Sequence, residues 1–364
     1  MTTIREVARV SGVGLGTVSR ALNGDPRVRP ETRARVIAVA EQLGYRPNVL
    51  AQAMRTKSSR TVGLIVPDLQ NEFFMAGAEV VQHRLAESGY RLIIGCSDNQ
   101  DHLDRNILQS MAERRVDAIL HVPCTPSGST SLRETFPDLP VVEFCRRSSR
   151  DDVDSVIGDE EVGAADVVTH LVGLGHKHIA LITGPTTLST SEARIRGFRR
   201  GLQAAKIPLR HCPIASVEFT SHAAENATEE LLQRHPEVTA IFAASSRGTA
   251  GVMRALHHRR LAVPEQMSVV GFLDPDWFDS VQPRVTCFKL PLGQMGTAAA
   301  VLLVERLNHA VPRRPRRIVI PGELLVRDST APPKPAAATK SARARPAKTT
   351  TKTTKTQAAG RASG

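Results

Sequence analysis

Three polar residues near the N-terminus, Thr17, Ser19 and Arg20, have types and a spacing that suit contact with DNA. An arginine can bond two acceptors on a guanine edge at once, while serine and threonine hydroxyls reach bases or phosphates. Val18 and Ala21 recur at a helical step and form an apolar stripe beside them, which leaves the polar side of a helix free to face a major groove. The alternative is a small helical cap whose polar face is only hydrated.

Neighbouring segments are expected to position this helix. Ile4 and Val7 predict a preceding short helix, and Gly12 suits the tight turn of a helix-turn-helix. A third helix is predicted over about 30–43, with a proline in its first turn and Gly44 as its stop. The sequence therefore predicts an all-α helix-turn-helix head.

A short helical segment at 49–54 follows the head, and then a polar linker at 57–60. A helix of that length is marginal alone in water, so we expect it to order only with a partner.

Positive charge is concentrated at the two ends of the 364-residue chain, whose net charge is +12. Residues 1–60 hold eleven Arg and Lys against four Asp and Glu, and residues 331–364 hold eight Arg and Lys and no acid. The 270 residues between them carry a slight negative charge. Phosphate contacts supply most non-specific affinity for nucleic acid, so this distribution points to DNA. No apolar run approaches the roughly 20 residues that span a bilayer, and no membrane partner is expected.

The pattern of apolar and polar residues changes from residue 61 onwards. Short apolar runs alternate with helical patterns, which is typical of parallel sheets covered on both faces. The strands are expected at 62–67, 92–96, 118–122, 141–145, 179–183, 240–244 and 269–272, and the helices include 73–88, 162–174, 191–205, 223–233, 248–258 and 294–310. These elements are too many for one modest sheet. The predicted fold is α/β, with two doubly wound subdomains and a ligand cleft between them at the strand ends.

The remaining features exclude several classes of protein. The five cysteines are far apart and form no metal-ligand pattern, so reduced thiols in a cytoplasmic protein are expected, with no metal site and no cofactor. The tail, residues 331–364, is rich in Pro, Ala, Lys and Thr and is predicted to be disordered. The first residues lack the succession of charged, apolar and small residues of a secretory signal, so secretion is not expected. The domain prediction is therefore 1–47 for the head, 48–60 for the hinge and linker, 61–330 for the two-subdomain body and 331–364 for the basic tail.

Several motifs, in one order along the chain, resemble the lactose-repressor/galactose-repressor family of bacterial transcription regulators. The resemblance runs from Ile4 to about Thr330. Its most specific parts are Thr17–Asn23, Leu43–Asn48, Gly63–Pro67, Gly175-His176, Val263-Pro264 and Pro283–Thr286. It implies a periplasmic-binding-protein-like body and a homodimer, or a tetramer, that binds a near-palindromic double-stranded operator in the cytoplasm, associated with the nucleoid.

The resemblance also implies which residues contact DNA. Base reading falls on Leu15, Gly16 and Arg20, and backbone contacts fall on Thr17, Ser19, Asn23, Thr32 and Asn48. In the hinge, Ala51 and Met54 belong to the DNA contacts, and Met54 matches an apolar wedge that enters the minor groove and kinks the DNA. Gly16 can read no base directly, so shape and bending are expected to carry more of the specificity.

By the same resemblance, an effector binds between the two subdomains. The implied effector-binding residues are Phe73, Phe74, Asp159, Arg194, Ser245, Ser246, Leu273 and Trp277. Arg194 suits a carboxylate, a phosphate or a sugar hydroxyl, and the alternative is an ion pair at a helix start. Asp159 has a similar alternative. Trp277 either stacks on a ligand or plugs the cleft.

Two polar anchors that are usual in the family are absent. Ser245-Ser246 stands where Asn-Asp is common, and Leu273 stands where an aspartate is common. Because unpaired buried polar groups are costly, a ligand with fewer hydroxyls is expected, such as an organic acid or a sugar derivative held by Arg194.

These features favour a ligand-responsive transcriptional repressor. The alternatives are a ligand-independent repressor with an empty cleft, a nucleoid-associated architectural protein that uses the basic tail, and a small-molecule receptor with no role on DNA. An enzyme is not expected, because no nucleophile–base pair, phosphate loop or metal constellation stands out.

Overall fold

Helices and strands alternate through most of the chain in the computed structural model, which describes residues 2–45, 58–124, 131–308 and 314–334. The chain divides into two units, Met1–Pro333 and Lys334–Gly364, and every element named below lies in the first unit. The hinge contacts predicted at Asn48, Ala51 and Met54, and all but the first residues of the predicted tail, lie outside the described residues.

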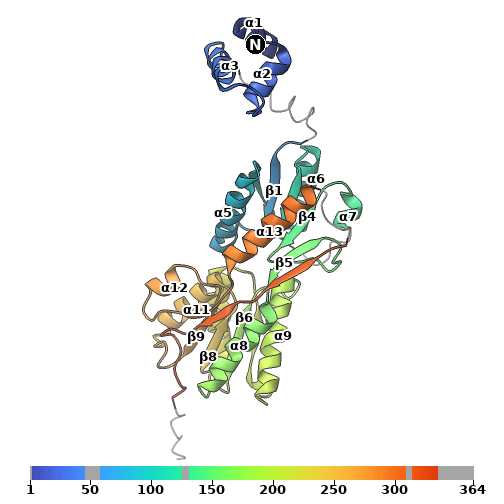
Figure 1. The fold of residues 1–364 in the computed structure, drawn as a ribbon. Coiled ribbons are helices and arrows are strands. Elements are labelled where there is room, and N and C mark those ends of the chain that lie inside the picture. The colour runs from blue at the N-terminus through green and yellow to red at the C-terminus, as the bar shows by residue number, and fades with distance from the viewer. Residues whose placement is uncertain (1, 46–57, 125–130, 309–313, 335–364) are drawn as a thin grey trace, which may run out of the picture. The chain divides into compact units, whose positions relative to one another are not determined.

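Three helices form the N-terminal head (Figure 1). They are α1 (Ile4–Ser11), α2 (Leu15–Leu22) and α3 (Pro30–Gln42). One small core of buried side chains, including Val7, Val18 and Val36, holds them together. The backbone of Gly12 and Gly44 has φ of 69° and 59°, a left-handed conformation that glycine adopts without strain at helix ends. The predicted three-helix head and its glycine stops are confirmed.

The first sheet of the body has six parallel strands in the order β11-β5-β4-β3-β1-β2. The strands are β1 (Thr61–Val66), β2 (Arg91–Cys96), β3 (Ala118–His121), β4 (Val141–Phe144), β5 (Asp154–Gly158) and β11 (Arg317–Ile320). Side chains along each strand alternate between two cores, so that Leu120 packs with α5 (Glu72–Glu87) and α13 (Leu292–Leu307) while Ile119 packs with α6 (Asp101–Glu113). The short helix α7 (Leu132–Thr135) lies on the same face as α6.

The second sheet has the order β12-β10-β9-β8-β6-β7 and one antiparallel pair, β10 with β12. Its strands are β6 (Ile179–Thr183), β7 (Ile214–Ser216), β8 (Ala240–Ala243), β9 (Ser268–Phe272), β10 (Thr286–Lys289) and β12 (Glu323–Leu325). Its helices are α8 (Glu160–Gly173), α9 (Ser189–Ala204), α10 (Ser221–Arg234), α11 (Ser246–His258) and α12 (Trp277–Ser280). The pair α8 and α9 covers one face, and the pair α10 and α11 covers the other.

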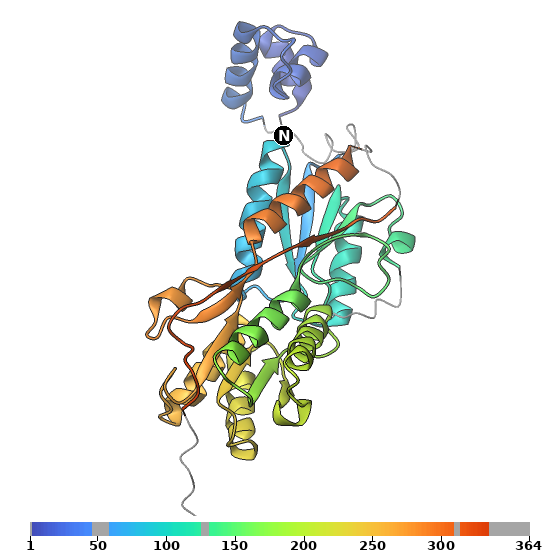
Figure 2. The same ribbon diagram turned by 60° about the horizontal axis from the view of Figure 1, so that its bottom comes forward.

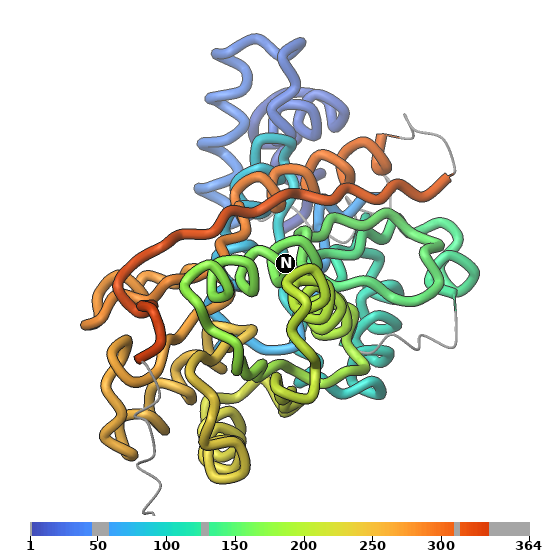
Figure 3. The backbone as a smooth tube through the Cα atoms, turned by 90° about the horizontal axis from the view of Figure 1, so that it is seen from below, coloured from blue at the N-terminus to red at the C-terminus, as the bar shows by residue number. Residues whose placement is uncertain are grey.

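The chain passes between the two sheets three times. The passages run from β5 to α8, from β10 to α13 and from β11 to β12. Figure 2 and Figure 3 show the last of these, the segment that carries β11 and β12, extending across both halves of the body. The predicted pair of doubly wound subdomains is confirmed, and each is built from separate stretches of sequence.

The seven strands predicted from apolar runs are all present, to within one or two residues at their ends. Five others were missed: β5, β7, β10, β11 and β12. β7 and β12 are only three residues long, and β11 alternates exposed and half-buried side chains as an edge strand. Short or edge strands lack the continuous apolar run on which the prediction depended. Of the helices described, none has the length and apolarity needed to cross a membrane.

Helices α8 and α9 pack so closely that the substitution Gly197→Ala is expected to destabilise the body. A Cβ at Gly197 would lie 2.1 Å from the carbonyl oxygen of Glu161 and 2.8 Å from the Cβ of Ala164. Overpacking of this kind costs about 1–3 kcal/mol. As a matched control, Gly293→Ala in α13 meets nothing within 4 Å and should keep or slightly raise stability. Thermal unfolding measures both variants, and equal midpoints would contradict the predicted close contact.

Candidate functional site

Helix α2 presents the predicted DNA-reading residues on the open side of the head. Its inner side is fixed because Val18 and Ala21 are buried in the head core. Leu15 is 46% exposed, an unusual position for a leucine, and Arg20 is also exposed. The guanidinium Nη2 of Arg20 lies 3.5 Å from the hydroxyl of Thr17, which orients it along the helix surface. The helix therefore offers a cation and an apolar side chain to a partner.

The other predicted DNA contacts surround this surface. Asn23 and Gly16 are exposed, while Thr17, Ser19 and Thr32 are half-buried. The turn after α2 is held by Arg33, whose Nη2 donates to the carbonyl oxygens of Gly24 and Asp25. This bonding fixes α3 against the end of α2.

Contacts across the body join its two subdomains near the strand ends. Asp68, which follows β1, forms an ion pair with Arg247 of α11. Arg146, which follows β4, lies over the ring of Phe219 at 5.6 Å from its centroid. The strands on both sides end here, so these contacts lie where the doubly wound topology predicts a ligand cleft.

Arg194 is buried at this cleft on α9. Its Nε lies 2.7 Å from Oε2 of Glu160, the first residue of α8, and its Nη1 donates to the carbonyl oxygen of Ala244. Its guanidinium also lies 4.2 Å from the ring centroid of Phe272, within the range of a cation–π contact. The ion pair at a helix start, considered as an alternative from the sequence, is therefore present.

A second buried arginine, Arg146, lies near enough to Arg194 for their positive charges to repel one another. Its Nη1 lies 3.0 Å from Oδ1 of Asn99 and 3.4 Å from the carbonyl oxygen of Pro123, and its guanidinium packs on the rings of Phe74 and Phe219. Burial, together with the charge of Arg194, lowers the pKa of Arg146 to about 10, so it stays charged at neutral pH. Among the described residues, it forms no ion pair with a carboxylate.

Arg146 is not among the effector-binding residues predicted from the sequence. A signal was available, because Cys145-Arg146 directly follows the buried strand β4, where ligand-binding residues of such sheets are found. Cys145 has φ of 62°, and Leu273, at the corresponding end of β9, has φ of 72°. Both are left-handed conformations that cost a non-glycine residue about 1–3 kcal/mol and that concentrate at functional sites.

The structure gives the other predicted effector-binding residues local partners. Asp159 caps α8 by accepting from the backbone N–H of Val162 at 3.2 Å, and Ser245 caps α11 in the same way with Gly248 at 2.9 Å. Ser246 is buried and Phe73 is half-buried.

Near the end of β9, Trp277 packs edge-on against Phe278, with ring centroids 4.5 Å apart, in a satellite core. Asp274, next to Leu273, forms ion pairs with Arg327 and Lys289 rather than extending toward Arg194. No cluster of His, Cys, Asp and Glu suited to a metal ion occurs within the described ranges.

Two family models match the chain. Residues 3–48 match the model described as "Bacterial regulatory proteins, lacI family", and residues 168–330 match "Periplasmic binding protein-like domain". Among relatives, catabolite control protein A of Priestia megaterium is 32% identical over 84% of this chain and 92% of its own length. The transcriptional regulator AscG of Escherichia coli is 31% identical over 92% of this chain and 99% of its own length.

Solved structures agree with these matches. A lac repressor dimer bound to operator and the anti-inducer ONPF has a TM-score of 0.81 over 91% of this chain and 99% of that one, with 24% identity, a likeness of fold. The complex of the regulator CelR with cellobiose has a TM-score of 0.68 and 29% identity, over 90% of this chain and 100% of that one. The chain therefore belongs to the lacI family of bacterial transcriptional regulators, with a helix-turn-helix DNA-binding head and a periplasmic-binding-like effector domain.

Proposed function

We propose that this regulator is a repressor that binds a near-palindromic operator as a homodimer, and that an anionic small molecule bound between its subdomains changes its operator affinity. The observation that carries the choice of effector is the buried charge of the cleft. The cleft holds two buried guanidinium groups, Arg146 and Arg194, but only Arg194 is paired with a carboxylate, that of Glu160.

An anion would correct this imbalance. A buried charge is costly unless it is paired, and arginine binds carboxylate or phosphate groups through two parallel hydrogen bonds. The rings of Phe74 and Phe219 flank Arg146 and limit the ligand to one that fits between them. The solved relatives include complexes with cellobiose and with ribose, which are neutral sugars. For this chain we propose an organic acid or a phosphorylated sugar derivative.

The switch would act by closing the body. Asp68 and Arg247 approach one another from opposite subdomains, as do Arg146 and Phe219. A ligand that bridges the same two surfaces would favour the closed form, since it binds that form better. In a dimer, closure would change the spacing of the two hinges at 48–60, where Ala51 and Met54 are proposed to contact the minor groove.

The head, hinge, body and tail boundaries predicted from the sequence remain part of this proposal, as do a cytoplasmic, nucleoid-associated location and assembly beyond a dimer. In each half-site, Arg20 and Leu15 would read bases, while Thr17, Ser19, Asn23, Thr32 and Asn48 would hold the backbone.

Replacing Arg20 by alanine is expected to relax operator specificity by about 1–3 kcal/mol, because a bidentate contact to one base is lost. Arg234→Ala, at an exposed position of α10 in the body, removes the same charge and should leave specificity unchanged. Footprinting and competition with mutated operators measure the difference. An identical footprint and selectivity for Arg20→Ala would reject α2 as the reading helix.

Arg146→Met is expected to abolish the response to anions while leaving the free protein as stable as before, or more stable. It removes a buried charge that has no carboxylate partner and retains its apolar bulk. Arg194→Met is the matched contrast, because it leaves Glu160 buried without its partner and should cost about 3–5 kcal/mol.

Thermal unfolding of the wild type and of Arg146→Met, each with glucose 6-phosphate, citrate or neutral glucose, tests this prediction. We expect an anion, but not glucose, to raise the unfolding midpoint of the wild type. Arg146→Met should lose that increase. A retained anion shift in Arg146→Met would place the effector elsewhere. No stabilisation by any anion would favour the ligand-independent repressor.

Deletion of residues 331–364 tests the architectural alternative. We expect operator selectivity to survive. Because eight positive charges are removed, non-specific affinity for DNA should fall and should depend less steeply on salt concentration. Gel-shift titrations at several salt concentrations measure both quantities. Loss of selectivity with the tail would show that the head is not the reader.

A further inference from the structure

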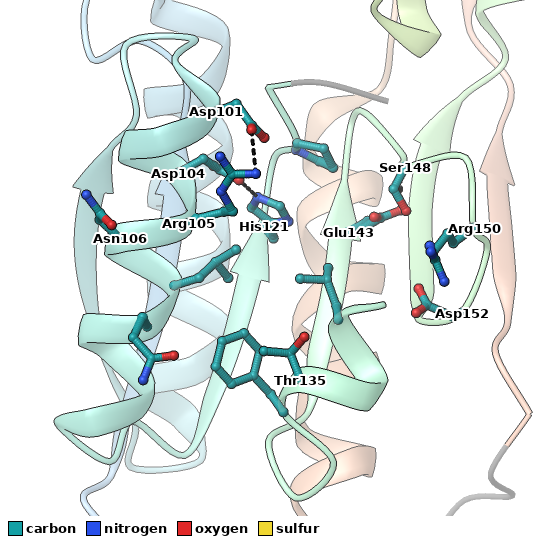
Figure 4. Close-up of a pocket in the computed structure, with 15 residues that line it drawn as sticks. Asp101, Asp104, Arg105, Asn106, His121, Thr135, Glu143, Ser148, Arg150 and Asp152 are labelled. Carbon is teal, nitrogen blue, oxygen red and sulfur yellow. Dashed lines mark hydrogen bonds and ion pairs between the residues drawn. The ribbon is translucent and has the colours of Figure 1, made fainter. Parts of the chain in front are cut away.

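A cavity lies outside the predicted effector cleft, on the face of the first sheet covered by α6 and α7 (Figure 4). Its volume is about 380 Å³, within the range of small-molecule sites. Its buried ionisable side chains are Asp104 from α6, His121 from β3 and Glu143 from β4. The other charged side chains of its lining are Asp101, Arg105, Arg150 and Asp152, so four acids face two arginines. The predicted effector residues do not line it.

Strand register brings two of these groups together. His121 and Glu143 are paired residues of the adjacent parallel strands β3 and β4, so their side chains leave the sheet on the same face. Figure 4 shows both projecting into the space between the strands and α6. Nε2 of His121 lies 2.8 Å from Oδ2 of Asp104, with both side chains buried.

The remaining polar atoms of these three residues lack partners. Oε1 of Glu143, Oδ1 of Asp104 and Nδ1 of His121 are buried and bond to nothing among the described residues. Glu143 is only 1% exposed, and its other oxygen accepts from the backbone N–H of Ser148 at 3.0 Å. Burying such atoms without partners destabilises the protein, and more so when the group is charged.

These orphan atoms share one chemical requirement. An ionised carboxylate only accepts hydrogen bonds, and a neutral histidine whose Nε2–H faces Asp104 leaves Nδ1 as an acceptor. The two orphan carboxylate oxygens, joined in that tautomer by Nδ1 of His121, therefore call for a donor-rich group. Burial raises the pKa of Glu143, and this effect outweighs the opposing effects of the hydrogen bond from Ser148 and of nearby His121.

An apolar wall lies among the other residues that line the cavity. Leu108 of α6, Leu132 of α7 and Phe136 line it opposite the acceptors. Exposed side chains such as Gln109 stand at its rim. The cavity thus combines one anionic, accepting end with an apolar wall.

From this arrangement we infer that the cavity is a second ligand site, which binds an organic cation. Its ammonium or amidinium group would donate to Glu143, Asp104 and His121, and its apolar body would lie on Leu132 and Phe136. The site is separate from the anion-binding cleft, so the body would receive two ligands of opposite charge.

Benzamidine and phenethylammonium are suitable probes for the full-length protein, with benzamide and benzoate as neutral and anionic controls. Calorimetry and ligand-observed NMR should detect both cations and neither control. Glu143→Gln keeps the acceptor for Ser148 and removes the charge, and it should weaken cation binding about tenfold or more. The matched control Glu87→Gln, an exposed carboxyl on α5, should bind as the wild type does.

Gln109→Trp provides an independent test, because it fills the exposed rim without altering the buried acids. It should abolish cation binding even if Glu143→Gln fails to fold. Equal binding of benzamidine by wild type and Gln109→Trp would overturn the inference. So would equal affinity for benzamide, or a cavity that holds only water in the presence of both cations.

Discussion

The body depends on close packing at the place where its chain passes between the two sheets. All three passages contribute to it. A Cβ on Gly158, at the end of β5, would lie 2.6 Å from Cδ1 of Leu290, which follows β10. A Cβ on Gly163 or Gly322 would lie 2.4 or 2.5 Å from Cε1 of Phe288. Because interiors tolerate little extra volume, any larger side chain at these glycines would force Phe288, Leu290 or the adjoining backbone to shift.

Strand β4 and the loop after it serve two sites of opposite character. Glu143, within the strand, points toward the helices α6 and α7, where buried acceptors are in excess. Arg146, just beyond the strand, lies in the cleft, where buried positive charge is in excess. The β-strand alternation that separates two cores also separates these two environments, so three residues of sequence connect them. A ligand in either site would therefore restrain the same short segment.

Much of this arrangement could be predicted from the sequence, and the limits are physical. Continuous apolar runs predicted β1 and β8, since buried parallel strands need such runs, but β11 and β12 pair at edges and carry no such signal. The ion pair of Arg194 was predicted as the alternative to ligand binding, because ion pairs are favoured where a helix begins. The partners of Arg146 and the cavity at Glu143 could not be predicted, because they depend on strand register and on residues far apart in sequence.

The C-terminal strands have a consequence for how the molecule is made. β11 forms one edge of the first sheet and β12 forms one edge of the second, and only two residues separate them. Helix α13, which covers the first sheet, also follows nearly the whole second subdomain in sequence. Neither sheet can therefore be completed as its earlier strands leave the ribosome. The earlier strands of both sheets keep exposed edges until β11 and β12 are synthesised. The two subdomains therefore reach their final form together, at the end of synthesis.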